Sequence, residues 1–190
     1  MVYGNFKSRS VNEDSTCKPI GMYGNYKISG ENITKAFNDV YKLPYTIVRP
    51  SALYGERCIS RRVGQIFIEN AITNKPIEIK ANTNEKLDFT YIKDFINGLQ
   101  KIISKKSSIC ETFNITYGNA KKITDLILIL KNHFPTLKIV LKKRDKLMPK
   151  RGTLSIVKAK RKLNFKPNWP LSAGYNEYIR WYKSFYKKNA

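Results

Sequence analysis

The chain alternates amphipathic helical segments with short apolar segments, and this order constrains its fold more than any other feature. Residues 26–41 carry apolar side chains at helical spacing: Ile33, Ala36, Phe37, Val40 and Tyr41. Leu43-Pro44 ends this segment, and residues 45–48 form an apolar run between prolines, which is typical of a strand buried in a parallel sheet. A helix followed by such a strand is half of a βαβ unit, so we expect an α/β fold.

The rest of the chain continues this pattern. Leu87, Phe89 and Tyr91 alternate with Asp88 and Thr90, which predicts a half-buried strand. Helical spacing predicts further helices, and the last of them has an aromatic stripe that we assign to the core. The expected helices are residues 63–73, 93–103, 123–134, 155–163 and 172–186, and the expected strands are residues 76–80, 112–116 and 138–141.

The chain is strongly basic, with 36 Lys and Arg residues against 14 Asp and Glu residues, a net charge of +22. Positive charge favours nucleic-acid binding, because the cations displace counterions from phosphates. The lysines are spread along the chain, however, and only residues 142–162 are densely basic. We therefore expect no nucleic-acid partner and keep such a domain as a third hypothesis.

No apolar run reaches the roughly 20 residues of a membrane-spanning helix, and the first ten residues do not resemble a signal peptide. We therefore expect no membrane partner and a cytoplasmic location. Cys17, Cys58 and Cys110 are widely spaced and form no CxxC pair. No cluster of His, Cys, Asp and Glu has metal-ligand spacing, so we assign no metal.

Tyr23 and Lys27 form the pair with the clearest chemical meaning. Residues four apart lie on one helix face, so both side chains can point into one pocket. A phenol is a poor base at neutral pH, and a nearby cation stabilises its phenolate form. Taken alone, YxxxK is a weak signal in a chain rich in Tyr and Lys, and it is also compatible with an ordinary amphipathic helix end.

Further segments give this pair a context. After Val2-Tyr3-Gly4, Tyr23-Lys27 and Glu31 come LPYTIVRPSALYGER (43–57), LDFTYIKD (87–94), FNITYG (113–118) and KAKRKLNFKPNWPLSAGYNEYIRWY (158–182). In this order they resemble the extended short-chain dehydrogenase/reductase family, and within it the NAD-dependent nucleotide-sugar epimerases and dehydratases, such as UDP-glucose 4-epimerase. The resemblance covers nearly the whole chain.

The resemblance implies roles for several residues. Tyr23 would be the catalytic acid/base, and Lys27 would hold the nicotinamide ribose of NAD and assist Tyr23. Pro50 and Ser51 would lie beside the nicotinamide and the sugar, at the end of a strand, where open α/β sheets bind ligands. Arg62, Lys80 and Arg151 would bind the nucleotide diphosphate of the substrate, most simply a UDP-sugar. For each arginine, plain surface charge is the alternative.

The resemblance also implies the domain organisation. We expect the C-terminal part of a Rossmann-like, doubly wound parallel sheet plus a smaller α/β substrate-binding domain. Residues 1–55 would be a remnant of the NAD-binding domain, and residues 56–190 mainly the nucleotide-sugar-binding domain, with some elements returning to the first part.

The sequence departs from the family pattern at its start. The glycine-rich GxxGxxG turn that places the NAD pyrophosphate at a helix N-terminus is absent. We therefore expect a C-terminal portion of an epimerase, with weak NAD affinity and doubtful activity on its own. The strand at 45–48 would then lack a neighbour on one side and expose an apolar edge.

Three functions stay open from sequence alone. The first is an NAD-dependent epimerase, with a dehydratase or reductase of the same family as its nearest rival. Met1 stands where dehydratases carry a Glu before the VYG motif, which favours the epimerase. The second is a non-catalytic sugar-nucleotide-binding remnant, and the third is the nucleic-acid-binding domain. A homodimer through helices 63–73 or 93–103 is also expected from the resemblance.

Overall fold

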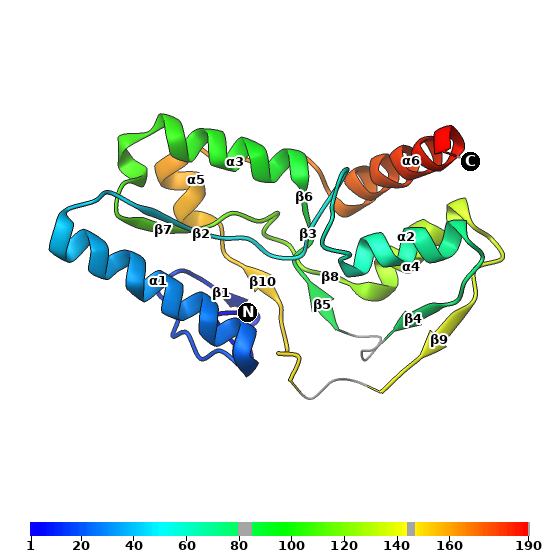
Figure 1. Cartoon of the computed structure of the whole chain (residues 1–190), viewed down its shortest axis with the longest axis horizontal. Helices are drawn as coiled ribbons and strands as arrows, with labels where there is room; N and C mark the ends of the chain where they lie inside the picture. The colour runs from blue at the N-terminus through cyan, green and yellow to red at the C-terminus, as the bar shows by residue number, and fades with distance from the viewer. Residues whose placement is uncertain (80–84, 144–146, 190) are drawn as a thin grey trace.

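A computed structural model describes residues 1–79, 85–143 and 147–189 (Figure 1). A parallel strand pair, β2 (Thr46–Arg49) and β7 (Glu111–Asn114), lies in the N-terminal half of the fold, with Arg49 opposite Asn114 at its carboxyl end. Helices α3 (Ile92–Ser104) and α5 (Val157–Leu163) lie on one side of this pair and α1 (Gly21–Tyr41) on the other. This arrangement confirms the expected α/β fold with parallel strands.

Two apolar clusters hold this half together. One joins β7 to α5 and the residues after it, with Phe113, Ile115, Leu163 and Phe165 fully buried. The other lies around β1 (Ser10–Val11), which pairs in parallel with β10 (Thr153–Leu154). Within the described residues β7 is the only strand that pairs with β2, as expected for a strand that lacks a neighbour on one side.

The other half is built around three helices: α2 (Val63–Ile72), α4 (Ile123–His133) and α6 (Leu171–Asn189). Its strand pairs are short. They are β3 (Leu53–Tyr54) with β6 (Thr90–Tyr91), β4 (Ile77–Ile79) with β9 (Ile139–Leu141), and the antiparallel β5 (Lys86–Leu87) with β8 (Lys121–Lys122). A short 3-10 helix, η1 (Lys106–Ser108), precedes β7.

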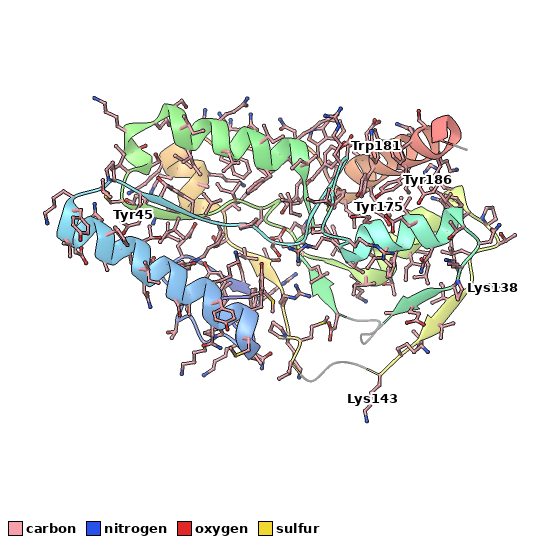
Figure 2. All side chains as sticks on the ribbon, viewed as in Figure 1. Tyr45, Lys138, Lys143, Tyr175, Trp181 and Tyr186 are labelled. Atoms are coloured by element: carbon pink, nitrogen blue, oxygen red, sulfur yellow. The ribbon has the colours of Figure 1, made fainter. Side chains whose placement is uncertain are left out.

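Most of the apolar stripe of α6 fills the core of this half, as predicted, while Phe185 near its end is half exposed. Tyr175 and Tyr178 are fully buried, and their rings contact the ring of Tyr54. Figure 2 labels Tyr175, Trp181 and Tyr186 along this helix. Large aromatic side chains supply much of the buried apolar area in such a core. The buried apolar residues of the two halves form separate clusters. The domain boundary expected near residue 55 stays a prediction.

The apolar stripe predicted on residues 26–41 is present on α1 but is not buried. Ile33, Phe37 and Val40 are exposed. The helix packs through its opposite side, where Gly24 is buried and Ile28 joins the cluster around β1. The periodicity therefore predicted the helix correctly, while its apolar face has no cover within the described residues.

The predicted half-buried strand at residues 87–91 is wrong in two respects. It is divided between β5 and β6, and Asp88 and Thr90 are as fully buried as their apolar neighbours. The reason is a network around the Asp88 carboxylate, which accepts hydrogen bonds from the backbone N–H groups of Gly118 and Leu154 and from the Thr116 hydroxyl. These hydrogen bonds satisfy the oxygens of a carboxylate that the alternation of apolar and polar residues at 87–91 would place in solvent.

Within the described residues, no helix is both long enough and apolar enough to cross a membrane.

Burial of Asp88 predicts a measurable pH dependence of stability. Desolvation raises the pKa of this carboxyl to about 6, against hydrogen bonds that lower it. Because the folded-state pKa lies above the unfolded value of 3.8, the folded state binds the extra proton, and this group stabilises the fold as pH falls from about 6 to 4. Relative to Asp88→Asn, the free energy of unfolding of the unmodified chain should rise by about 2 kcal/mol over that range.

Urea unfolding of both chains at intervals between pH 4 and pH 7.5 measures this difference. A difference that does not change with pH, or that falls as the pH falls, would show that the donors hold Asp88 ionised instead.

Candidate active site

The first turn of α1 is fixed by two glycines. Gly21 begins the helix with φ +70°, a conformation that L side chains rarely adopt. A side chain at Gly24 would lie 2.8 Å from the Pro19 Cβ and 3.2 Å from the Met1 carbonyl oxygen. The chain start therefore packs directly against the helix, and the residues beside Gly24 point away from this contact.

Tyr23 and Lys27 come together on this helix as predicted from their spacing. The Lys27 Nζ lies 5.5 Å from the centroid of the Tyr23 ring, within the range of a cation–π contact. Half of the Tyr23 surface is exposed, and Lys27 is exposed too. Within the described residues, neither the phenol nor the ammonium has a hydrogen-bond partner, so both groups are open to a ligand.

Arg49 lies at the carboxyl end of β2 and binds α1 through Glu31. Its Nε and Nη2 donate to the two carboxylate oxygens of Glu31 at 2.9 and 2.6 Å, and both side chains are nearly buried. Its Nη1 also donates to the Tyr3 hydroxyl at 2.8 Å and the Glu13 carbonyl oxygen at 3.3 Å. Burial opposes the charge of Arg49, but the bonds to Glu31 and Tyr3 outweigh it and raise the pKa of the guanidinium.

Tyr3 connects this cation to the neighbouring strand. The Tyr3 hydroxyl donates to the Asn114 Oδ1 at 2.8 Å, and the Asn114 backbone N–H donates to the Glu13 carboxylate at 2.8 Å. Burial raises the pKa of Tyr3 to about 12, so the phenol stays protonated at neutral pH. Chain start, α1, β2 and β7 therefore meet at one polar cluster.

The other predicted site residues are placed less closely together. Pro50 and Ser51 follow β2 directly, at the carboxyl end of the parallel pair. Arg62 stands before α2 and donates to the Ser60 hydroxyl at 3.1 Å. Arg151 stands beside β10, where it is half-buried. Arg62 and Arg151 thus belong to different halves of the fold, and Lys80 lies outside the described residues.

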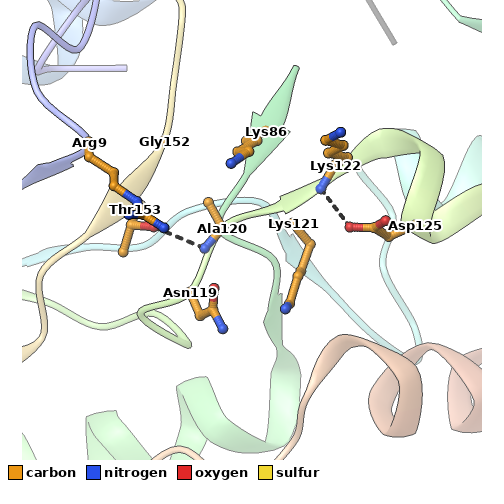
Figure 3. A pocket seen from close by; sticks show the side chains of 9 residues that line it. All are labelled: Arg9, Lys86, Asn119, Ala120, Lys121, Lys122, Asp125, Gly152 and Thr153. Atoms are coloured by element: carbon orange, nitrogen blue, oxygen red, sulfur yellow. Dashed lines mark hydrogen bonds between the residues drawn. The ribbon is translucent and has the colours of Figure 1, made fainter. Parts of the chain in front are cut away.

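A basic hollow of about 340 Å³ lies between β5, β8 and β10 (Figure 3). Its lining is Arg9, Lys86, Asn119, Ala120, Lys121, Lys122, Asp125, Gly152 and Thr153. Asp125 is the one acidic residue among these, and its carboxylate accepts the backbone N–H of Lys122 at 2.9 Å. The side chains of Arg9, Lys86 and Lys121 have no acidic partner among the described residues.

Sequence analysis missed this hollow because its cations come from three distant segments. Unpaired cations around a concavity are suited to phosphate or another anion. Arg9 lies just outside the motif at residues 2–4, and Lys121 and Lys122 lie just outside the motif at residues 113–118. This proximity to the motifs was the sequence signal that could have indicated the hollow.

The comparisons with known proteins agree with this geometry. The model of the family described as NAD dependent epimerase/dehydratase matches residues 1–116. An uncharacterized UDP-glucose epimerase of Bacillus subtilis is 29% identical over 98% of this chain and 59% of its own length. UDP-glucuronate 4-epimerase 1 of Arabidopsis thaliana is 30% identical over 99% of this chain and 48% of its own length. The chain therefore spans about half to three-fifths of these relatives.

Solved structures show the same relationship. UDP-glucuronic acid 4-epimerase from Bacillus cereus, in complex with UDP-glucuronic acid and NAD, superposes with a TM-score of 0.91 at 29% identity, over 97% of this chain and 59% of that one. UDP-glucose 4-epimerase from Thermotoga maritima, with UDP-glucose, gives 0.89 at 26% identity, over 96% and 60%. With the Tyr23–Lys27 pair in place at the start of α1 and the family model matching more than half of its residues, the chain belongs to the NAD-dependent epimerase/dehydratase family.

Proposed function

We propose that this chain supplies the catalytic pair and the sugar-nucleotide-binding part of an NAD-dependent UDP-sugar 4-epimerase. The observation that carries the proposal is the exposed Tyr23–Lys27 pair on α1, a helix bound through Glu31 to Arg49 at the carboxyl end of a parallel strand pair, in a member of this family. Related proteins named as UDP-glucose and UDP-glucuronate 4-epimerases support the substrate class.

Tyr23 is the proton-transfer group in this proposal. Its phenolate oxygen would take the proton of the sugar 4-hydroxyl, and the resulting phenol would later return a proton, so Tyr23 would act as base and then as acid. Lys27, 5.5 Å from the ring, stabilises the phenolate and holds a second hydroxyl group by hydrogen bonding. Both roles need side chains that are not engaged elsewhere, which is what the structure provides.

The described residues fit one end of NAD. The free Tyr23 hydroxyl and Lys27 ammonium suit the nicotinamide ribose, and Pro50 and Ser51 stand at the strand end beside the Arg49 cluster. Bound NAD would supply the acceptor, and then the donor, of a hydride at the sugar carbon. The described part of the chain holds no glycine-rich turn for the pyrophosphate, so we propose that these contacts alone bind NAD weakly.

The basic hollow is the position that we propose for the diphosphate of the sugar nucleotide. Arg9, Lys86 and Lys121 are among the residues that line this hollow, and none of the three has an acidic partner within the described residues. A guanidinium pairs with two phosphate oxygens at once, and ammonium groups add charge. Arg62, Lys80 and Arg151 stay proposed for the same ligand, and a homodimer and a cytoplasmic location also stay proposals.

Binding of the two ligands tests the proposal directly. Isothermal titration calorimetry of the purified chain with UDP-glucose, UDP-glucuronate and NAD should show heat with a UDP-sugar and weak or no heat with NAD alone. Tight NAD binding would contradict the expected weakness of the cofactor contacts. Heat with none of the three would contradict the sugar-nucleotide proposal and leave a folded remnant without these ligands.

Removal of the Tyr23 hydroxyl tests its catalytic role. Tyr23→Phe should lower the rate of UDP-sugar 4-epimerisation by about 10²- to 10⁴-fold, the usual contribution of a positioned acid/base. Conversion is followed by separating the two epimers chromatographically, with NAD in excess. Tyr26→Phe is the matched control because Tyr26 is exposed on the same helix, and its rate should not change. Equal rates for both variants would remove Tyr23 from the reaction.

Charge reversal in the hollow tests the diphosphate position. Lys86→Glu and Lys121→Glu should each weaken UDP binding by at least tenfold, because each replaces an attraction to phosphate with a repulsion. Lys106→Glu in η1 makes the same change of net charge outside the hollow lining and serves as the control. Calorimetry with UDP at fixed ionic strength gives the three affinities. Equal losses in all three variants would mean that net charge, not the hollow, attracts the nucleotide.

A further inference from the structure

Glu31 continues the helical row of the proposed catalytic pair. Tyr23, Lys27 and Glu31 are spaced by four residues on α1, so their side chains lie along one face of the helix. A carboxylate four residues after a lysine lies within reach of its ammonium group, and such pairs form readily on helices. Lys27 therefore has a ready ion-pair partner one turn away.

The structure shows that Glu31 is engaged elsewhere. Both of its carboxylate oxygens accept hydrogen bonds from Arg49, at 2.9 and 2.6 Å, and its side chain is 10% exposed. A bidentate guanidinium–carboxylate pair is stronger and more directional than a lysine contact. Lys27 is correspondingly exposed, and its ammonium lies over the Tyr23 ring.

Arg49 is itself held in place from three directions. The Tyr3 hydroxyl and the Glu13 carbonyl oxygen accept from its Nη1, and the Tyr3 ring lies 4.8 Å from its guanidinium carbon. Its backbone belongs to β2, where it stands opposite Asn114 of β7. The guanidinium is therefore fixed relative to the strand end and cannot follow α1 if the helix turns.

We propose that Arg49 is a positioning residue that acts through Glu31. By holding both oxygens of the Glu31 carboxylate it prevents an ion pair between Glu31 and Lys27, and it fixes the rotation of α1 so that Tyr23 and Lys27 keep their position relative to the carboxyl end of β2. The role in catalysis rests on the function proposed for Tyr23 and Lys27. The prevention of an ion pair between Lys27 and Glu31 does not depend on that function.

Two substitutions break the same ion pair with opposite consequences for Lys27. Arg49→Met frees the Glu31 carboxylate, which then pairs with Lys27. Glu31→Gln removes the carboxylate, so Lys27 keeps its freedom. If the Arg49–Glu31 pair served only to stabilise the fold, the two variants would change the amine reactivity of Lys27 equally.

The amine reactivity of Lys27 reports its freedom without any need for activity. Acetylation of the whole chain by a limiting amount of an amine-reactive reagent is followed by mass spectrometry of the peptide containing Lys27. Lys106 in η1 is the internal reference, because Lys35 lies four residues after Glu31 and could pair with it too. In Arg49→Met the Lys27 rate should fall about twofold, the effect of one helical ion pair, and in Glu31→Gln it should match the unmodified chain. Arg49→Met with Glu31→Gln should restore the rate.

Arg49→Lys is a second variant that tests the proposal even if Arg49→Met does not fold. A lysine keeps the positive charge but holds fewer carboxylate oxygens, so the Lys27 rate should lie between those of the unmodified chain and Arg49→Met. An unchanged Lys27 rate in both Arg49 variants, or equal changes in Arg49→Met and Glu31→Gln, would overturn the proposal.

Epimerase assays on the same variants separate this inference from the proposed function. The turnover number should follow the Lys27 rate, lower in Arg49→Met than in Glu31→Gln, with little change in the Michaelis constant for the UDP-sugar. If Tyr23→Phe leaves the turnover number unchanged, the proposed function is wrong. If Lys27 is still acetylated more slowly in Arg49→Met, the effect of Arg49 on Lys27 remains valid in that case. Turnover that falls equally in both variants would overturn the catalytic part of the inference.

Discussion

The buried guanidinium of Arg49 is the constraint on which the site depends. A charge removed from water has to be compensated by hydrogen bonds and an opposite charge, and here two parts of the chain provide them. Glu31 comes from α1, and Tyr3 and Glu13 come from the chain start, while Arg49 itself belongs to β2. Because each donor or acceptor has its own place in the chain, the cluster fixes α1 relative to the strand end, and with it the row that carries Tyr23 and Lys27.

Most elements of the fold, and the proximity of Tyr23 and Lys27 in the candidate site, could be predicted from the sequence. Proline boundaries and apolar periodicity identified β2 and α4 to within about one residue, and the YxxxK spacing identified Tyr23 and Lys27. These features are local, because a helix or a short strand is specified largely by neighbours within one or two turns. The order of the motifs along the chain then indicated the family.

Features formed by contacts between distant segments could not be predicted. Alternation placed Asp88 in solvent, yet backbone groups 30 and 66 residues away surround it. The basic hollow joins Arg9 to Lys86 and Lys121, and no periodicity connects these positions. Arg49 offered a partial signal, because a charged residue at the end of an apolar strand requires a partner. The sequence of the chain did not indicate which carboxylate would be that partner, and the structure shows that it is Glu31.

The exposed apolar side of α1 has a consequence for how copies of this chain behave together. Ile33, Phe37 and Val40 present a surface that favours association, while the net charge of +22 drives copies apart. The repulsion between exposed charges is screened over about 10 Å at 0.1 M salt, whereas attraction between apolar surfaces is not weakened by screening. Ionic strength therefore sets the balance between dispersed and clustered chains, and dilute salt is the condition in which α1 stays uncovered.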